Sequence, residues 1–149
     1  MPTYVVTAIE GRLSSGQKLR MAEAITRIHN EVTGAPLFFA QVIVNEVKAG
    51  NYFVGGAALD RNQIFVQAEI RAGRSSEKKL ALLQGIIEAV AESADTARSE
   101  VWAYIRELPA TQMAEFGHVL PEPGDEQNWI AALPDSERQR IHAIGRPAR

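Results

Sequence analysis

The chain has 149 residues, of which 46% are hydrophobic and 23% are charged, a composition typical of one globular domain with a proper core. Its net charge of −2 and its lack of cysteine exclude a strongly basic nucleic-acid-binding surface, disulfides and cysteine metal sites. No secretory signal and no apolar run of about 20 residues is found, so we expect a cytoplasmic protein with no nucleic acid and no membrane partner.

Proline stands at the start of the first predicted element. Residues 3–9 are rich in β-branched and aromatic types, which predicts a strand directly after Pro2. Removal of Met1, which is usual before a small residue, would leave Pro2 with a free secondary amine that can hold or release a proton. The alternative is that Pro2 only begins an edge strand, where a missing N–H group is harmless.

A helix is predicted next. Ser14 and Gln17 have the spacing of a capping box, and Thr33-Gly34 is a plausible end. Apolar residues at helical spacing predict the buried stripe Leu19, Ala22, Ile25, Ile28 and Val32. His29 lies on the border of this stripe, where a histidine is more often structural than catalytic.

The second half of the chain repeats the first. When the sequence is aligned with itself so that Tyr4 falls on Phe65, similar residues coincide through strand-like and helix-like segments alike. This register predicts strands at 38–47, 64–70 and 100–108. It also predicts a helix capped by Ser75 or Ser76, with the buried stripe Leu80, Leu83, Ile86, Ile87 and Val90.

Two consecutive βαβ units follow from this pattern. We therefore expect one α/β (α+β) domain over residues 1–149, with repeat one at about 2–60 and repeat two at about 62–116. Its four-stranded sheet would carry both helices on one face. The other face would be bare, which predicts oligomerisation.

The repeat is lost after Leu108. Residues 117–149 contain the turn-forming segment 121–124, then Trp129 and a short helical pattern at about 135–144. This segment is too small for a second domain. We interpret it as a C-terminal arm that packs on the core or on a neighbouring subunit.

Two arginines are the next candidates for function. Arg71 and Arg74 flank Gly73 where the third strand ends and the second helix begins. Their planar guanidinium groups, beside the N–H groups of a helix start, suit a carboxylate or a phosphate. A solvated basic loop is the simpler alternative.

Tyr104 and Glu115 complete the candidate residues. Tyr104 alternates with Trp102 and Arg106 on the last strand, so it also suits a core or an interface. Glu115 would have a raised pKa if desolvated, although most glutamates face water. The three histidines lack the spacing of a metal site, and no phosphate-binding loop or serine nucleophile elbow is found.

Taken together, these features resemble the tautomerase superfamily, whose members use an N-terminal proline on a βαβ fold. The double length resembles its cis-3-chloroacrylic acid dehalogenase branch most closely. The resemblance covers nearly the whole chain and is carried by several separated blocks in order and spacing. Among them are residues 24–29, 40–42, 49–51, 71–75, 101–104, 109–113 and 120–129. Residues 36–39 and 60–62 depart from the dedicated dehalogenase.

The resemblance implies a site and an activity. Residues matching those associated with catalysis in that branch are Pro2, His29, Arg71, Arg74, Tyr104 and Glu115. It implies hydration and dehalogenation of small unsaturated carboxylates by a homotrimer that needs no cofactor or metal, with promiscuous keto–enol tautomerase activity. His29, Arg71 and Arg74 would bind the substrate carboxylate. The alternatives are a dedicated tautomerase and, in a different class, a non-catalytic binding protein on the same fold.

Overall fold

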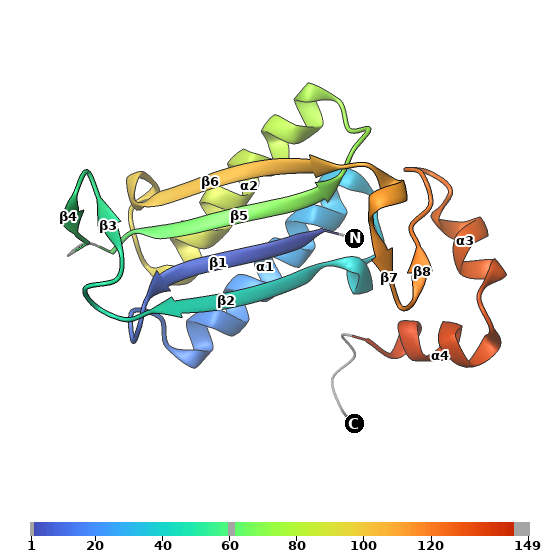
Figure 1. Cartoon of the computed structure of the whole chain (residues 1–149), viewed down its shortest axis with the longest axis horizontal. Helices are drawn as coiled ribbons and strands as arrows, with labels where there is room; N and C mark the ends of the chain where they lie inside the picture. Colours follow the sequence, from blue (N-terminus) through green and yellow to red (C-terminus); the bar gives the residue numbers. More distant parts are fainter. Residues whose placement is uncertain (1, 60–61, 145–149) are drawn as a thin grey trace.

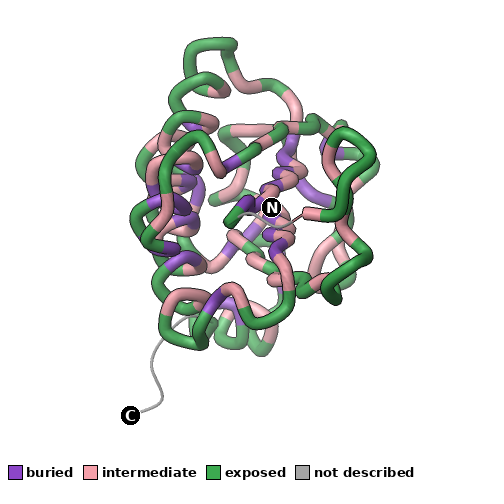
Figure 2. The backbone as a smooth tube through the Cα atoms, turned by 90° about the vertical axis from the view of Figure 1, so that its left-hand side faces the viewer, coloured by how far each residue is buried: buried purple, intermediate pink, exposed green. Residues whose placement is uncertain are grey.

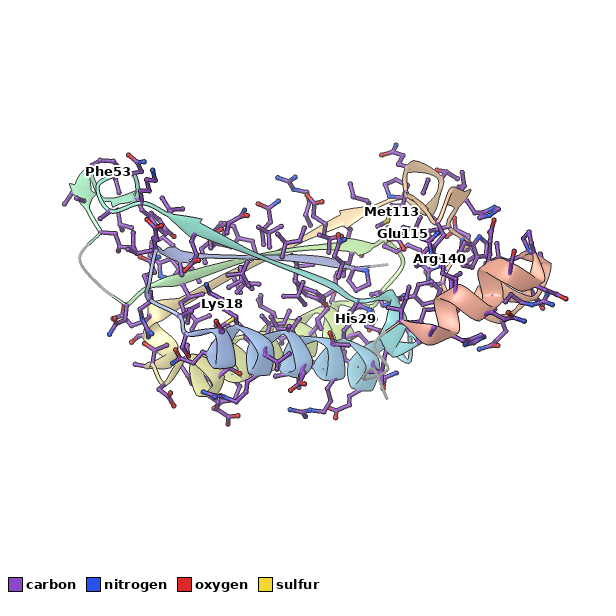
Figure 3. All side chains as sticks on the ribbon, turned by 90° about the horizontal axis from the view of Figure 1, so that it is seen from below. Lys18, His29, Phe53, Met113, Glu115 and Arg140 are labelled. Atoms are coloured by element: carbon purple, nitrogen blue, oxygen red, sulfur yellow. The ribbon has the colours of Figure 1, made fainter. Side chains whose placement is uncertain are left out.

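A four-stranded sheet with two long helices on one face forms the body of the protein. A computed structural model describes residues 2–59 and 62–144. In Figure 3 both helices lie on one side of the sheet, and in Figure 1 the chain after the last long strand gathers at the sheet end where the N-terminus lies. Buried residues concentrate between these layers (Figure 2). The predicted fold class is confirmed.

The first βαβ unit comprises β1 (Thr3–Ile9), α1 (Ser15–Thr33) and β2 (Gln41–Val47), with β1 and β2 parallel. Ser14 and Gln17 form the predicted capping box, which satisfies backbone N–H groups at the start of α1. The helix ends at Gly34, whose φ of 74° suits glycine.

The second unit comprises β5 (Ile64–Arg71), α2 (Ser76–Ala94) and β6 (Val101–Leu108), again with parallel strands. Ser75 is its N-cap residue. Antiparallel pairing of β1 with β5 joins the units into the strand order β2-β1-β5-β6.

The predicted closing strands begin too early. Residues Leu37–Phe39 and Arg98–Glu100 form short 3₁₀ helices, so β2 begins at Gln41 and β6 at Val101. These two turns occupy corresponding places in the two repeats. Each brings the chain from the end of its helix into the following strand.

The predicted buried stripes are also wrong in part. Leu19 and Leu80, which occupy corresponding places in the repeat, are 61% and 55% exposed. The side chain buried in α1 two residues later is Met21, and in α2 it is Leu82. Because a helix turns about 100° per residue, two positions place side chains on nearly opposite sides. The sequence pattern did not show which apolar side faces the sheet.

Small hairpins follow each unit. Strands β3 (Phe53–Val54) and β4 (Ala57–Ala58) lie at one end of the sheet, and β7 (Ala114–Glu115) and β8 (His118–Val119) lie at the other (Figure 1). Because they occupy matching places in the repeat register, the internal duplication extends beyond the two βαβ units.

The C-terminal arm packs against the end of the core where β1 begins (Figure 1). It contains α3 (Glu126–Ala132) and α4 (Asp135–Ala143), and the Trp129 ring lies 6.0 Å from the Phe39 ring. Gly73, with a φ of 99°, allows Pro123 to approach so closely that an added Cβ atom would lie 3.3 Å from its ring. Among the described residues, no helix is long and apolar enough to cross a membrane.

The sheet face opposite the helices carries exposed apolar side chains. Ile43, Trp102 and Tyr104 are 40%, 44% and 60% exposed. They come from the two outer strands, β2 and β6. This bare face agrees with the expectation of a half-covered sheet.

Candidate active site

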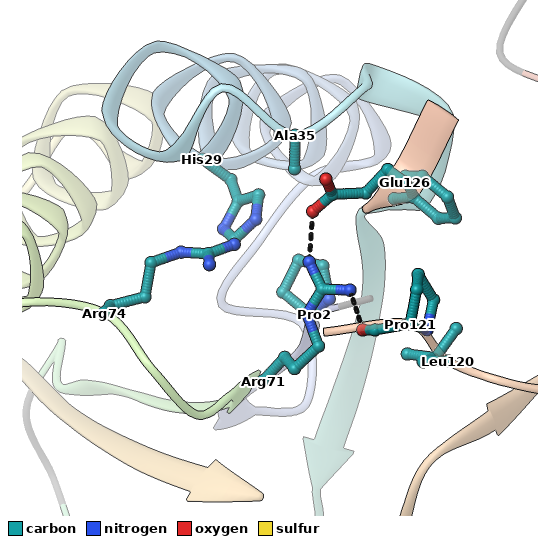
Figure 4. A pocket seen from close by; sticks show the side chains of 9 residues that line it. Pro2, His29, Ala35, Arg71, Arg74, Leu120, Pro121 and Glu126 are labelled. Atoms are coloured by element: carbon teal, nitrogen blue, oxygen red, sulfur yellow. Dashed lines mark hydrogen bonds and ion pairs between the residues drawn. The ribbon is translucent and has the colours of Figure 1, made fainter. Parts of the chain in front are cut away.

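A small pocket lies where the N-terminal end of β1 meets the C-terminal end of β5 (Figure 4). It brings together four predicted site residues: Pro2, His29, Arg71 and Arg74. The remaining lining residues are Ala35, Phe39, Leu120, Pro121 and Glu126. Both repeats and the arm therefore contribute to one pocket.

His29 is held by a buried tyrosine. Its Nδ1 atom lies 2.7 Å from the hydroxyl oxygen of Tyr4, which is completely buried on β1. Burial, followed by the positive charge of Arg74, lowers the pKa of His29 to about 3, so the ring is neutral near pH 7. Its buried Nε2 atom has no hydrogen-bond partner among the described residues.

Arg71 is bound by the C-terminal arm. It is 7% exposed, and its two terminal nitrogens donate to the carbonyl oxygen of Pro121 and to the carboxylate of Glu126 (Figure 4). Its third nitrogen, Nε, is buried without a partner among the described residues. The arm thus fixes the direction of this guanidinium group.

Arg74 has a different environment. It forms no ion pair with any described residue, and its Nε atom is buried without a partner within that part of the chain. Burial and the neighbouring charge of Arg71 lower the pKa of Arg74, which means that its cation is incompletely compensated. A bound anion would relieve this cost.

Glu126 is the residue that the sequence analysis missed. It begins α3, and its second carboxylate oxygen accepts the Gly124 N–H group at 2.9 Å. Burial raises its pKa, but backbone N–H groups and Arg71 outweigh that effect, so the pKa of Glu126 is lowered and it is a carboxylate. An acidic residue in the first turn after Pro123-Gly124 is an ordinary helix signal, so no sequence pattern indicates that it lies in a pocket.

The other two predicted site residues, Glu115 and Tyr104, lie outside the lining of this pocket. Glu115 lies on β7, at the same end of the molecule as His29 (Figure 3), and its burial raises its pKa against the opposing charge of Arg71. It precedes a tight turn in which Phe116 and Gly117 both have positive φ. Tyr104 is on the bare sheet face, with its ring 5.1 Å from that of Phe65. The single chain brings Tyr104 into no pocket with Pro2.

Metal chemistry has no site in the described part of the chain. No group of three or more histidine, aspartate or glutamate side chains that could hold a metal ion occurs there. The pocket instead presents two cations, one carboxylate and a neutral imidazole, which is a set of groups suited to binding an anion and moving protons.

The family of putative oxalocrotonate tautomerase enzymes matches residues 1–132 of the chain. The chain belongs to this family. A probable tautomerase of Bacillus cereus is 39% identical over 59 residues, which cover 40% of this chain and 95% of that protein. This tautomerase is thus about two fifths as long, as expected for a relative that corresponds to one repeat of this chain.

Two solved structures extend the comparison. The crystal structure of N1, a member of the cis-3-chloroacrylic acid dehalogenase family, is 32% identical and has a TM-score of 0.92, covering 95% of this chain and 99% of that one. A fused 4-OT symmetric trimer is 25% identical with a TM-score of 0.71, covering 81% and 97%. These findings support a tautomerase-like enzyme of the isomerase type.

Proposed function

We propose that this protein is an N-terminal-proline enzyme that hydrates and dehalogenates small unsaturated carboxylates and also tautomerises enol-pyruvates. The observation that carries the proposal is the gathering of Pro2, His29 and Arg74 around one small cavity, with partnerless nitrogen atoms on His29 and Arg74. Buried polar atoms are normally hydrogen-bonded, so unsatisfied polar atoms on residues that line a pocket favour a polar ligand. A carboxylate fits their charge.

The charges around Pro2 set its proposed role. At an effective dielectric of about 20, an uncompensated guanidinium about 6 Å away disfavours a protonated amine by about 2.8 kcal/mol, or about two pKa units. When a substrate carboxylate neutralises Arg74, this effect is cancelled and the Pro2 amine favours its protonated form. Neutral Pro2 can therefore act as a base, and protonated Pro2 as an acid.

Hydration then combines proton transfer from Pro2 with the addition of water. Protonated Pro2 gives its proton to the carbon next to the carboxylate, while a water molecule adds to the following carbon and releases a proton to Glu115. With a 3-haloacrylate the product carries hydroxyl and halogen on one carbon, and it collapses to an aldehyde, a halide ion and a proton. The raised pKa of Glu115 suits a general base that must accept a proton near neutral pH.

Tautomerisation needs fewer catalytic groups of the same site than hydration does. Neutral Pro2 accepts the proton of an enol hydroxyl and returns a proton to carbon, so no water is activated. A dedicated tautomerase is the second candidate function, because Tyr104 is 60% exposed and lies outside the pocket of the single chain. The two functions differ in their need for Tyr104 and Glu115.

Association of subunits would allow Tyr104 to take part in hydration although it lies outside the pocket of its own chain. We propose a homotrimer in which the bare sheet face is covered, since exposed Ile43 and Trp102 flank Tyr104 there. Tyr104 would then serve the pocket of a neighbouring subunit. Sedimentation equilibrium should give three times the chain mass, and a stable monomer would contradict this arrangement.

The proposed function is tested at Pro2. Intact mass must first show that Met1 has been removed, since only then is the Pro2 amine free. Pro2→Ala should lower kcat/KM by about 10²–10⁴-fold for phenylenolpyruvate tautomerisation and for 3-chloroacrylate hydration, because alanine supplies a primary amine of different basicity. Unchanged turnover in the correctly processed variant would contradict the mechanism, and retained methionine would favour a non-catalytic binding protein.

A further inference from the structure

Glu126 places a carboxylate of the protein itself inside an anion-binding pocket. It lines the cavity together with Arg71 and Arg74, and its side chain is 17% exposed. One of its oxygens is paired with Arg71, and the other accepts the Gly124 N–H group. The carboxylate is therefore held on both sides by the fold.

The guanidinium group of Arg71 already has partners within the protein. Its two terminal nitrogens, which would form the fork for a substrate carboxylate, donate to Glu126 and to the carbonyl oxygen of Pro121. Arg74 has no such partner among the described residues. The two arginines that look alike in the sequence are thus unequal: Arg71 is paired directly with the arm, whereas Arg74 feels the charge of Glu126 without an ion pair to any described residue.

The charge of the pocket follows from this difference. While the Pro2 amine is neutral, the two guanidinium groups and the Glu126 carboxylate leave one net positive charge among the lining residues, since His29 is neutral as well. One ligand carboxylate balances this charge. A second carboxylate on the same ligand would meet the field of Glu126 in a partly desolvated cavity, where like charges repel strongly.

We propose that Glu126 is a specificity-determining residue that pairs with Arg71 and thereby makes the pocket select substrates with one carboxylate over substrates with two. This proposal rests on the carboxylate-binding function proposed above. Through Glu126, the C-terminal arm would thus contribute directly to substrate specificity. Arg74 and the Nε2 atom of His29 then remain as the groups that receive the substrate carboxylate.

The test compares two enols that differ by one carboxylate. 2-Hydroxypenta-2,4-dienoate has one, and 2-hydroxyhexa-2,4-dienedioate has two. The wild-type protein should prefer the first, and Glu126→Gln should shift the ratio of the two kcat/KM values toward the dicarboxylate by about ten- to a hundredfold, because it removes one charge without changing side-chain size. Glu126→Asp keeps the charge and should keep the preference.

Glu122→Gln is the matched control, because it makes the same chemical change at an exposed position of the same arm segment, outside the pocket lining. It should leave the ratio unchanged. If Glu126→Gln lowers both kcat/KM values by the same factor, Glu126 only supports the structure and the proposal is overturned. An equal shift in the Glu122 variant would also overturn it.

Binding of inert ligands separates this proposal from the proposed function. Calorimetric titration of the wild-type protein with butyrate and with succinate should show tighter binding of butyrate, whether or not either enol is turned over. Tighter binding of succinate would overturn the charge selection even if Glu126→Gln failed to fold. Absence of enol turnover together with a butyrate preference would contradict the proposed enzyme but support the role of Glu126.

Discussion

The two ends of the sheet are related by the internal repeat but differ in chemistry. At the pocket end stand Pro2, His29, Arg71, Arg74 and Glu115. In the repeat register, the corresponding residues at the other end are Gln63, Val90, Glu10, Leu13 and Val54. The two ends share one backbone arrangement, but the five positions at the far end that correspond to the site residues carry no proline, histidine or arginine.

The end of the sheet opposite the pocket lacks the groups of the candidate site. One surface depression at this end is lined by Asn62, Asp95, Thr96, Ala97 and Glu100, and a second includes Gln63 and Val54; neither lining contains an arginine or a histidine. Arg12, which is near this end, donates to the carbonyl oxygen of Ala94 at 3.2 Å and so serves the end of α2. One site per chain is the arrangement that this difference supports.

The comparison of the two ends predicts its largest effect on activity at Glu115, whose counterpart at the other end is Val54. Glu115→Gln keeps the size of the side chain but removes the base, so hydration of 3-chloroacrylate should fall by about 10²–10⁴-fold. Phenylenolpyruvate tautomerisation, which needs no activated water, should fall much less. Steady-state kinetics with both substrates measure the difference, and equal losses would show that Glu115 supports the site in another way.

Hydration should also depend on pH through this residue. Because burial raises the pKa of Glu115, the base is lost as the pH falls through a value above the ordinary 4.5 of glutamate. The acidic limb of the hydration profile should therefore lie above pH 4.5 and vanish in Glu115→Gln.

A smaller effect is expected when the arginines at the two ends are exchanged for alanine. Arg74→Ala removes the uncompensated cation of the pocket and should lower kcat/KM for carboxylates by about 10–100-fold, the value of a charged hydrogen bond. Arg12→Ala, at the far end, is the control and should leave kcat/KM unchanged. Similar losses in both variants would mean that the effect is one of stability.

The difference between His29 and its counterpart Val90 should appear in the pH dependence of the free energy of unfolding. The pKa of His29 is about 3 in the folded protein and about 6.5 when unfolded, so the unfolded chain binds an additional proton between these values. Folding stability due to this residue is therefore lost as the pH falls from 6.5 toward 3, by at most about 1.4 kcal/mol per pH unit. His29→Val, which copies the second repeat, should flatten this slope in urea unfolding measured between pH 7 and 4. Parallel wild-type and variant curves would contradict the burial of a neutral imidazole.

The smallest effects are expected at the two helix starts, where the repeats remain alike. Ser14 and Ser75 each accept a backbone N–H group as N-cap residues of α1 and α2. Each serine-to-alanine change should lower the free energy of unfolding by about 1 kcal/mol. Urea denaturation measures both, and a loss at only one of them would show that the repeats differ in their scaffold as well as in their chemistry.

Much of the fold was predictable from the sequence because its signals are local. The capping box at Ser14, the stop at Gly34 and the β-branched segments beginning at Thr3 and Ile64 each identify an element without reference to the rest of the chain. The self-alignment then related the two halves. Even the 3₁₀ turns that displaced β2 and β6 altered boundaries without changing the topology.

Features that depend on long-range contacts were not predictable. The hairpin strands contain two residues each, too few for an alternating pattern. The ion pair of Arg71 with Glu126 joins residues far apart in the sequence, so no spacing rule reveals it. Tyr104 stays a predicted site residue, because its proposed place depends on subunit association.

The β3–β4 hairpin, which lies at the end of the sheet away from the pocket (Figure 1), has one further consequence. A chain cut between Gly55 and Gly56 at its tip would give one fragment with Pro2 and His29 and another with both pocket arginines. Neither fragment could complete the pocket alone, and α1 packs so closely on α2 that Ile28 would clash with a Cβ atom at Gly85. Turnover after mixing the two fragments would then report their association into a complete pocket.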